Sequence, residues 1–319
     1  MLLLLALACK DGPLSDDTAA PAADTLRVVT WNIQSLGEPD SEEYGDALTV
    51  LSWIDADVIL LNEIDGYEDD QLETFAQALG HQVVSESNND FGALHNAALT
   101  RLELASSTVY DGETLSGDSG ARDLTRQIPE LRVLGPQTGE TVTFLGVHFK
   151  SGFDEDDAFR RNVDAERAGQ AARLGGSRVV VMGDFNEQVS DVPGSPASWS
   201  SLPSGLPSSY SLGDDLSDQL SDQGLRNDPF APLTDAGLRL VQAAQIDGDL
   251  GTRPSSGRRI DYIYASDAVE PQAAMVYSCL LEGTADAPIA FEGDSPGRGA
   301  CEDASDHLPV IAELRIIAD

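Results

Sequence analysis

The sequence predicts an α/β domain built of stacked layers, and three observations point to this class. Short apolar runs such as VVVM at 179–182 recur along the chain, and uninterrupted runs of this kind form strands that are buried on both faces of a sheet. Segments with helical spacing of apolar residues lie between these runs. The composition, 41% hydrophobic and 23% charged, is that of a soluble globular chain and excludes wholesale disorder, collagen and a polytopic membrane protein.

The expected elements follow one another from Thr25 to the end of the chain. Strands are predicted at 26–33, 57–61, 97–102, 130–134, 142–148, 178–182, 260–264 and 308–314. A helix is predicted to end over 47–54, and further helices are predicted at 70–79 and 156–174, the last of them long and polar. Residues 188–233 are rich in Ser, Pro, Gly and Asp and poor in apolar residues, so an extended surface loop is expected there. One domain is therefore predicted, over residues 25–319.

The first 24 residues are expected to lie outside this domain. MLLLLALAC is apolar and ends in small residues before Cys9, and its end resembles the lipobox of bacterial lipoproteins, in which the cysteine carries lipid after signal cleavage. The run is short and lacks a preceding Lys or Arg, which a start codon placed too late would explain; a buried strand is the alternative. It is too short to cross a bilayer as a helix. Residues 10–24 are then a flexible tether.

The cysteine count fits an exported protein. If Cys9 carries lipid, Cys279 and Cys301 remain as an even pair, which an oxidising compartment would join as a disulfide. The segment between them is rich in Gly, Asp and Pro and would gain order from such a link. Two unrelated free thiols are the alternative. We expect an exported monomer, held at the cell envelope through the lipid or released outside the cell.

The charge balance excludes one class of function. The chain has 55 acidic residues against 19 basic ones, a formal net charge of −36. Such a surface repels nucleic acid and anionic lipid at long range, so the protein is not a nucleic-acid binder of the basic-patch type. Any phosphate chemistry would need a divalent metal and local positive charge. The excess acid itself is interpreted as an adaptation for solubility or high salt.

Polar side chains stand at the ends of predicted strands, where layered α/β folds place their sites. Each has an ordinary interpretation when taken by itself, as a turn former, a solvated carboxylate or a cap. Their occurrence together, in six short motifs, is far more specific. The motifs hold Asn32 in WNI, Glu63 in NE, His148 and Lys150 in HFKS, Asp184 and Asn186 in GDFN, Asp261 in RIDYI, and Asp306 and His307 in SDHLPV.

In this order the six motifs resemble those of the endonuclease/exonuclease/phosphatase superfamily, the DNase I-like metal-dependent phosphodiesterases. The resemblance spans about residues 25–316, and GDFN and SDHLPV are its most specific parts. It implies a four-layer sandwich, in which two packed mixed β-sheets are flanked by helices. It also implies that the site lies at one end of this sandwich.

The resemblance implies a metal site of oxygen ligands. Hydrolysis of a phosphodiester requires a hard cation on a phosphate oxygen, an activated water in line, and stabilisation of the leaving oxygen. Glu63 is the expected main ligand of Mg²⁺ or Mn²⁺, with Asn32 and Asp306 completing the metal shell directly or through water. The four histidines, with no HExxH or CxxC cluster, make a tight zinc site an unfavourable interpretation.

The remaining motif residues are implied to act on water and phosphate. His307 is expected to be the general base or the group that polarises the phosphate, with Asp261 holding its other ring nitrogen. Asp184 would orient the attacking water or the leaving group, and Asn186 would donate hydrogen bonds to phosphoryl oxygens. His148 would bind phosphate or act as an acid.

Two basic residues are expected to contact the phosphate. Lys150 follows His148 within HFKS, in a chain that has one other lysine. Arg126 lies in RDLTRQIPEL, a segment that resembles the strand carrying a phosphate-binding arginine in the nucleases; a surface charge is its alternative.

The substrate is expected to be nucleic acid. HFKSG, a helix with Arg160 and Arg161, and then GDFN are most similar to secreted bacterial nucleases, so we expect a DNase I-like endonuclease. A sphingomyelinase-like phospholipase C is the alternative, because a negative surface tolerates the cationic choline of a phospholipid headgroup. An inactive binding module on the same fold is a further alternative, against which the complete motif set argues.

One acidic run is considered as a candidate Ca²⁺ site in addition to the predicted Mg²⁺ or Mn²⁺ site. GDDLSDQLSDQ at 213–223 lacks the spacing, the glycine and the terminal Glu of an EF-hand, so a solvated loop is the favoured interpretation. A structural Ca²⁺ held by this run is the alternative.

Overall fold

The structure is a computed structural model, and it describes residues 22–36, 38–65, 70–87, 94–189, 198–279 and 287–318. The predicted signal segment, Cys9 and nearly all of the predicted tether lie outside these residues. The first strand begins at Ala23, two residues before the predicted start of the domain. None of the helices in the described part of the chain is both long and apolar enough to cross a membrane.

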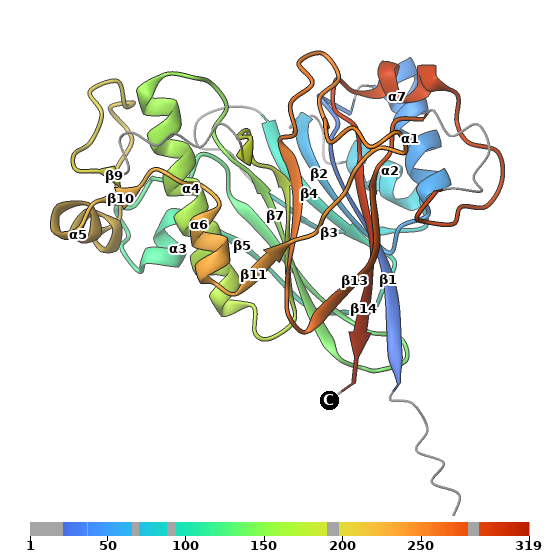
Figure 1. Cartoon of the computed structure of the whole chain (residues 1–319), viewed down its shortest axis with the longest axis horizontal. Helices are drawn as coiled ribbons and strands as arrows, with labels where there is room; N and C mark the ends of the chain where they lie inside the picture. The colour runs from blue at the N-terminus through green and yellow to red at the C-terminus, as the bar shows by residue number, and fades with distance from the viewer. Residues whose placement is uncertain are drawn as a thin grey trace, which may run out of the picture.

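Two six-stranded mixed sheets pack against each other at the centre of the molecule (Figure 1). The strand order of the first sheet is β13-β14-β1-β2-β4-β3, and that of the second is β11-β12-β8-β7-β6-β5. The strands of the first sheet are β1 (Ala23–Asn32), β2 (Val58–Asp65), β3 (Gln82–Glu86), β4 (Leu94–Thr100), β13 (Val269–Val276) and β14 (Val310–Ile317). Those of the second are β5 (Leu104–Tyr110), β6 (Ile128–Leu134), β7 (Thr141–His148), β8 (Val179–Asp184), β11 (Leu238–Leu240) and β12 (Asp261–Ser266).

Helices cover the outer sides of both sheets, which completes the four predicted layers (Figure 1). Beside the first sheet lie α1 (Glu42–Ile54), α2 (Asp70–Ala78) and α7 (Arg298–Ala304). Beside the second lie α3 (Gly112–Ser116), α4 (Glu155–Leu174), α5 (Asp214–Asp222) and α6 (Ala231–Asp235), with a two-stranded sheet of β9 (Ser198–Trp199) and β10 (Leu225–Arg226). The predicted sandwich of two mixed sheets flanked by helices is confirmed.

The central strands are buried on both faces, as their apolar runs predict. Along β8, Val180 and Met182 belong to the core between the sheets, whereas Val179 and Val181 belong to the core beneath α4. Successive side chains of a strand point to opposite faces, so one run of four apolar residues serves both layers.

Strand directions explain why the polar motif residues meet. A parallel pair forms the middle of each sheet, β1 with β2 and β7 with β8, and antiparallel strands flank it. The carboxyl ends of the parallel strands therefore lie at one end of the sandwich, together with the amino ends of β12 and β14. This end of the two sheets forms a single edge of the sandwich, and it carries all six motifs.

The prediction of an extended loop over 188–233 is wrong for much of that range. This range contains β9, α5 and β10 and the start of α6, and its Trp199, Leu216 and Leu225 form a third core with Phe159 and Val163 of α4. These few apolar residues are supplemented by an ion pair between Arg167 of α4 and Asp215 of α5. The acidic run at 213–223, predicted as a solvated loop, forms helix α5 instead. Three groups of carboxylate and histidine side chains in the described residues lie close enough together to hold a metal ion, and none of them includes a residue of α5.

The helix predicted at 156–174 is confirmed as α4, and six of its polar residues are buried: Arg160, Arg161, Asn162, Asp164, Glu166 and Arg167. The Arg167 side chain is fully buried and pairs with Asp123 at 2.5 Å and with Asp215 of α5 at 2.7 Å. A buried guanidinium is tolerated because both carboxylates neutralise it and accept its hydrogen bonds.

Cys279 and Cys301 form the predicted disulfide, with their Cα atoms 5.9 Å apart. It joins the segment that follows β13 to α7. Part of the intervening loop lies outside the described residues.

Candidate active site

Strand register places three of the predicted residues side by side in the second sheet. His148 at the end of β7 pairs with Asp184 at the end of β8, and Asp184 pairs with Asp261 at the start of β12. All three are buried. Neighbouring strands lie about 4.8 Å apart, so this register forces two carboxylates and an imidazole into one small volume.

The expected contact between Asp261 and His307 is present. Nδ1 of His307 lies 2.9 Å from Oδ2 of Asp261, and both side chains are almost fully buried. The backbone of His307 is also fixed, because its N–H donates to Ser305 Oγ and its carbonyl accepts from the indole of Trp31. With Nδ1 occupied, Nε2 is the ring nitrogen left for chemistry.

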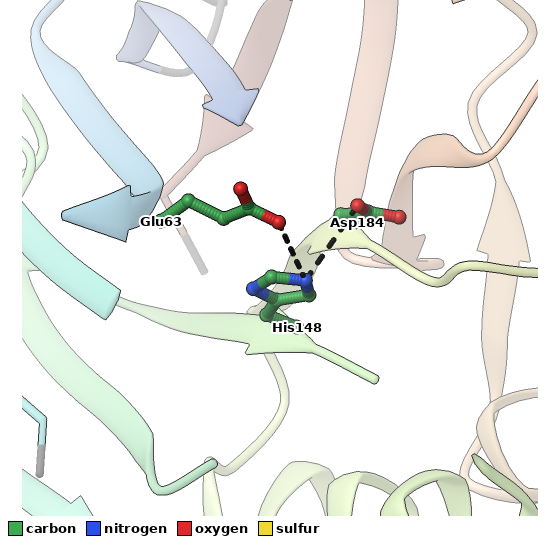
Figure 2. A group of neighbouring side chains, drawn as sticks. All are labelled: Glu63, His148 and Asp184. Atoms are coloured by element: carbon green, nitrogen blue, oxygen red, sulfur yellow. Dashed lines mark ion pairs between the residues drawn. The ribbon is translucent and has the colours of Figure 1, made fainter. Parts of the chain in front are cut away.

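A second group forms around His148 (Figure 2). Nε2 of His148 lies 3.5 Å from Oε1 of Glu63 and 3.7 Å from Oδ2 of Asp184. Both ring nitrogens of His148 are buried, and neither has a hydrogen-bond partner among the described residues. Buried polar atoms in folded proteins normally have partners, so these nitrogens indicate a place for a ligand.

Glu63 reaches this group through a bulge in β2. The register of β2 against β4 shifts between Asn62 and Ile64, and Glu63 between them has a φ of 61°, in the left-handed region. Left-handed backbone costs a residue with a side chain about 1–2 kcal/mol. A bulge re-aims its side chain, and here the Glu63 carboxylate is aimed at the buried imidazole while remaining partly exposed.

Asn62 is a site residue that the sequence analysis missed. Its Nδ2 donates to Asn96 Oδ1 at 2.8 Å and to the carbonyl of Val147 at 3.0 Å, and its Oδ1 accepts from the N–H of Asp184 at 3.0 Å. It therefore fastens β2 of the first sheet to β7 and β8 of the second. Its polarity within the apolar run VILLNE is the signal that could have identified it.

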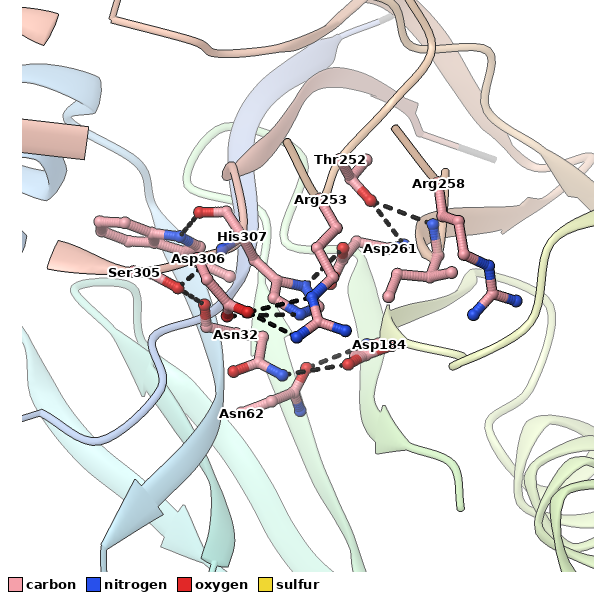
Figure 3. A network of polar contacts seen from close by, with 12 residues as sticks. Asn32, Asn62, Asp184, Thr252, Arg253, Arg258, Asp261, Ser305, Asp306 and His307 are labelled. Atoms are coloured by element: carbon pink, nitrogen blue, oxygen red, sulfur yellow. Dashed lines mark hydrogen bonds and ion pairs between the residues drawn. The ribbon is translucent and has the colours of Figure 1, made fainter. Parts of the chain in front are cut away.

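The predicted metal ligands Asn32 and Asp306 lie at the same edge (Figure 3). Nδ2 of Asn32 donates to Asp184 Oδ2 at 3.0 Å. Oδ2 of Asp306 accepts from Nε and Nη2 of Arg253, at 3.0 and 2.6 Å, and its Oδ1 lies 3.8 Å from His307 Nε2. Arg253 was not predicted, because a contact between residues 53 positions apart leaves no local trace in the sequence.

Asn186 and Arg126 border the site from the side of α4. The Asn186 N–H donates to Asp184 Oδ1 at 2.7 Å, and its Nδ2 donates to the carbonyl of Phe149. Nη1 of Arg126 donates to the same carbonyl at 3.2 Å. Burial lowers the pKa of Arg126, although carboxylates that include Glu63 and Asp184 oppose the shift, so this guanidinium lies within electrostatic range of the cluster.

Lys150 is held away from this cluster. Its Nζ pairs with Asp157 of α4 at 2.7 Å. Its backbone N–H donates to Asp164 at 2.8 Å, and Asp164 also accepts from the N–H of Thr125 at 2.7 Å. The buried Asp164, which the sequence analysis did not single out, thus ties the loop after His148 to the segment that carries Arg126.

The burial of these groups sets their charges. Burial lowers the pKa of His148 well below its usual range, and Arg126 and His307 lower it further, which favours the neutral imidazole. Burial raises the pKa of Asp184, and the neighbouring Asp261 raises it again. For His307 burial lowers the pKa, but the carboxylates around it, Asp261 first among them, outweigh burial and bring it to about 10.

The residues present fit a divalent cation. One ligand atom from each of Glu63, His148 and Asp184 lies within 4.8 Å of the others, and a second such group is made by Asp184, Asp261 and His307. The His148 nitrogens have no hydrogen-bond partner among the described residues, and burial beside Asp261 destabilises the Asp184 carboxylate, so a cation would find an imidazole lone pair and would stabilise the carboxylate. Asn32 offers an amide at this place, while one oxygen of Asp306 is already paired with Arg253.

The fold and this edge match one class of protein, and sequence comparison identifies it. The chain belongs to the endonuclease/exonuclease/phosphatase family, whose pattern matches residues 29–307. The superfamily consists of divalent-metal-dependent phosphodiesterases and phosphatases. No curated protein sequence matches the chain.

Solved structures share the fold at low sequence identity. An endonuclease/exonuclease/phosphatase from Beutenbergia cavernae DSM 12333 is 20% identical, with a TM-score of 0.58 over 92% of this chain and 72% of that one. The human Nocturnin catalytic domain with bound sulfate is 18% identical, with a TM-score of 0.54 over 91% and 93%. D. rerio TDP2 complexed with a single-strand DNA product is 13% identical, with a TM-score of 0.55 over 91% and 98%.

Proposed function

We propose that the protein is a Mg²⁺- or Mn²⁺-dependent DNase I-like endonuclease. The observation that supports this most strongly is the sharing of Asp184 between two adjoining groups. On one side it faces Glu63 and His148, which suit a cation, and on the other it faces the Asp261–His307 pair, which suits proton transfer. Metal and proton chemistry on one phosphate requires such adjacency.

Each side chain has a task in this proposal. When bound at Glu63, with Asn32 and Asp306 near it, the metal supplies charge stabilisation on a phosphoryl oxygen. Asp184, with its raised pKa, accepts a proton from the attacking water. His307 as imidazolium, favoured by its own raised pKa, donates a hydrogen bond from Nε2 to a phosphoryl oxygen while Asp261 holds Nδ1. As the bond from phosphorus to the leaving oxygen breaks, the leaving oxygen takes a proton from solvent water.

Further groups would bind the phosphate. Asn186, Arg126 and the buried His148 border the place where the phosphate would lie, and Arg126 supplies positive charge in a protein of −36 overall. Lys150 would reach the phosphate only after leaving Asp157.

A substrate panel tests the proposal. The purified full-length chain is incubated with plasmid DNA, RNA, sphingomyelin and small phosphodiesters, each with Mg²⁺, Mn²⁺ or EDTA. We expect cleavage of DNA that EDTA abolishes and either metal restores, and loss of cleavage in Glu63→Gln with an unchanged circular dichroism spectrum. Full activity in EDTA would contradict the metal role, cleavage of sphingomyelin alone would indicate a phospholipase, and inactivity on every substrate would indicate a binding module.

We further propose that the protein is exported as a monomeric envelope lipoprotein with lipid on Cys9. The Cys279–Cys301 disulfide supports an oxidising compartment. In cells that carry the gene with a complete signal sequence, Cys9→Ser should move the protein from the membrane fraction to the soluble fraction. Light scattering of the purified protein tests the monomer.

A further inference from the structure

An exposed aromatic ring stands beside the site. Phe153 is 86% exposed, more than any other large hydrophobic side chain of the described residues. A single exposed apolar residue needs no explanation by itself. Phe153 differs because the guanidinium of Arg258 lies over its ring, 5.4 Å from the centroid, and so one side of the ring has a defined partner while the ring as a whole remains open to solvent.

Three loops that carry site residues meet at this pair. Phe153 follows His148 in the loop after β7, Arg258 precedes Asp261, and Glu187 follows Asn186 in the loop after β8. Arg161 of α4 joins two of these loops, because Nη1 donates to the carbonyl of Gly152 at 3.1 Å and Nε lies 3.0 Å from the Glu187 carboxylate. Glu187 in turn lies 3.7 Å from Nη2 of Arg258.

The pair is also tied to the catalytic edge itself. The carbonyl of Arg258 accepts from the N–H groups of Thr252 and Arg253, at 2.9 and 3.0 Å, and the hydroxyl of Thr252 accepts from the N–H of Asp261 at 3.1 Å. Figure 3 shows Arg258 on the flank of the polar network, next to Thr252 and Asp261. The backbone that carries Arg258, over which the Phe153 ring stacks, is thus held at a fixed place relative to the Asp261–His307 pair.

We propose that Phe153 and Arg258 form a stacking platform for an unpaired nucleobase of the nucleic-acid strand whose phosphodiester is cleaved. The inference rests on the proposed function and narrows it to substrates with an unstacked base next to the scissile bond. Base stacking on an aromatic ring does not depend on net charge, which suits a protein whose −36 charge weakens attraction to phosphates. Arg258 lies over one face of the ring, which leaves the other face for a base.

A nucleobase fits the surroundings of Phe153 better than a lipid bilayer does. Asp154 and Glu155, directly after Phe153, are exposed, and insertion of the ring into a bilayer would draw these two carboxylates out of water with it. A base needs one ring face and leaves these carboxylates in water.

Binding and kinetics on two matched oligomers test the platform. Fluorescence anisotropy is measured in EDTA with a fluorescein-labelled oligothymidylate and with an abasic oligomer of the same length, and KM is measured with Mg²⁺ on the same pair. Phe153→Ala should weaken binding of the oligothymidylate by roughly 5- to 150-fold and raise its KM similarly, with kcat nearly unchanged. Binding of the abasic oligomer should not change, and Phe153→Trp should retain wild-type affinity.

Leu174→Ala is the matched control, because Leu174 is an exposed apolar residue at the opposite end of α4. An equal loss for both oligomers, or no loss for either, overturns the stacking role. Phe153-dependent binding to phosphatidylcholine vesicles without an effect on the oligothymidylate also overturns it, in favour of a membrane contact. If the wild type cleaves no nucleic acid yet binds the oligothymidylate through Phe153, the proposed nuclease function fails while the platform stands.

Discussion

Nδ1 of His307 lies 2.9 Å from Oδ2 of Asp261, although the two residues are 46 positions apart in the chain. The contact joins the start of β12 in one sheet to the segment before β14 in the other. An imidazole held in this way has a fixed orientation, because the carboxylate fixes one nitrogen and leaves the other for the reaction.

His307→Ala should reduce turnover by roughly two to four orders of magnitude, because a positioned proton-transfer group contributes about that much. Asp261→Asn should also reduce turnover, and the double variant should be little worse than His307→Ala, since the two residues act as a unit. Steady-state kinetics on DNA and thermal melts of all three variants are the measurements. A pair that only fastened the sheets together would instead lower the melting temperature and leave the turnover of folded protein near wild type.

The pKa of His307 should be raised in the metal-free protein, to about 10 from the ordinary 6.5. Asp261→Asn should bring it down, because the first carboxylate among those that raise it is removed. An NMR titration of the imidazole ring protons in EDTA measures both values. An Asp261→Asn protein with an unchanged His307 titration would contradict this electrostatic account.

The same shift makes the stability of the metal-free protein depend on pH. The folded state binds the His307 proton more tightly than the unfolded state, so this stabilisation is complete below about pH 6.5 and is lost as the pH rises towards 10. Urea unfolding in EDTA at a series of pH values should show the free energy of unfolding falling over this window. Asp261→Asn should flatten the fall.

The left-handed backbone of Glu63 should lower the free energy of unfolding, although it serves to aim the carboxylate into the site. Because its φ of 61° suits glycine, Glu63→Gly should be more stable than Glu63→Ala by about 1–2 kcal/mol. Both variants should lack activity. Urea unfolding of the two proteins isolates the backbone contribution, since neither retains the carboxylate. Equal stabilities would show that the bulge relaxes when the side chain is removed.

Gly183→Ala should destabilise the fold severely, by about 3 kcal/mol or more. Gly183 has a φ of 152°, and a Cβ there would overlap the carbonyl oxygen of Val147 on the adjacent parallel strand. The added methyl group would push β7 away from β8 next to the paired residues His148 and Asp184, so activity should fall as well. Gly176→Ala is a control for backbone strain alone, since Gly176 also has a positive φ, of 88°, but a Cβ there meets nothing within 4 Å. Similar melting temperatures for the two variants would contradict the steric argument.

Removal of the disulfide should cost about 3 kcal/mol, because it closes a loop of 22 positions and restricts the unfolded chain. The Cys279→Ser, Cys301→Ser double variant should show this loss in urea unfolding, and its folded fraction should retain activity, because the substitutions keep the backbone hydrogen bond from the Ser305 N–H to the Cys301 carbonyl. Mass spectrometry of the non-reduced wild type provides the direct check: two alkylatable thiols at these positions would show that the bond does not form.

The sequence predicted the strands that are buried on both faces, because an apolar run such as VVVM is stable in a strand when both of its faces are shielded from water. It did not predict the strands with mixed or exposed patterns, among them β5 and β13, because side chains at a sheet edge carry little periodicity. It also mistook the region around α5 for a loop. The packing of this region on α4 depends on the ion pair between Arg167 and Asp215. These two residues are 48 positions apart in the sequence, so no local pattern predicts the pair.

The order of six strand-end motifs, through its resemblance to a known superfamily, indicated the class of protein and placed ten polar residues in a candidate site, since the motifs are local in the sequence. Tertiary structure alone decided how those residues divide. It put Asp184 between two groups, turned Lys150 towards Asp157, gave Asp306 an arginine partner, and brought in Asn62. The physical reason is that strand identity depends on short-range patterns, whereas partners depend on register and on packing between sheets, which residues far apart in sequence fix together.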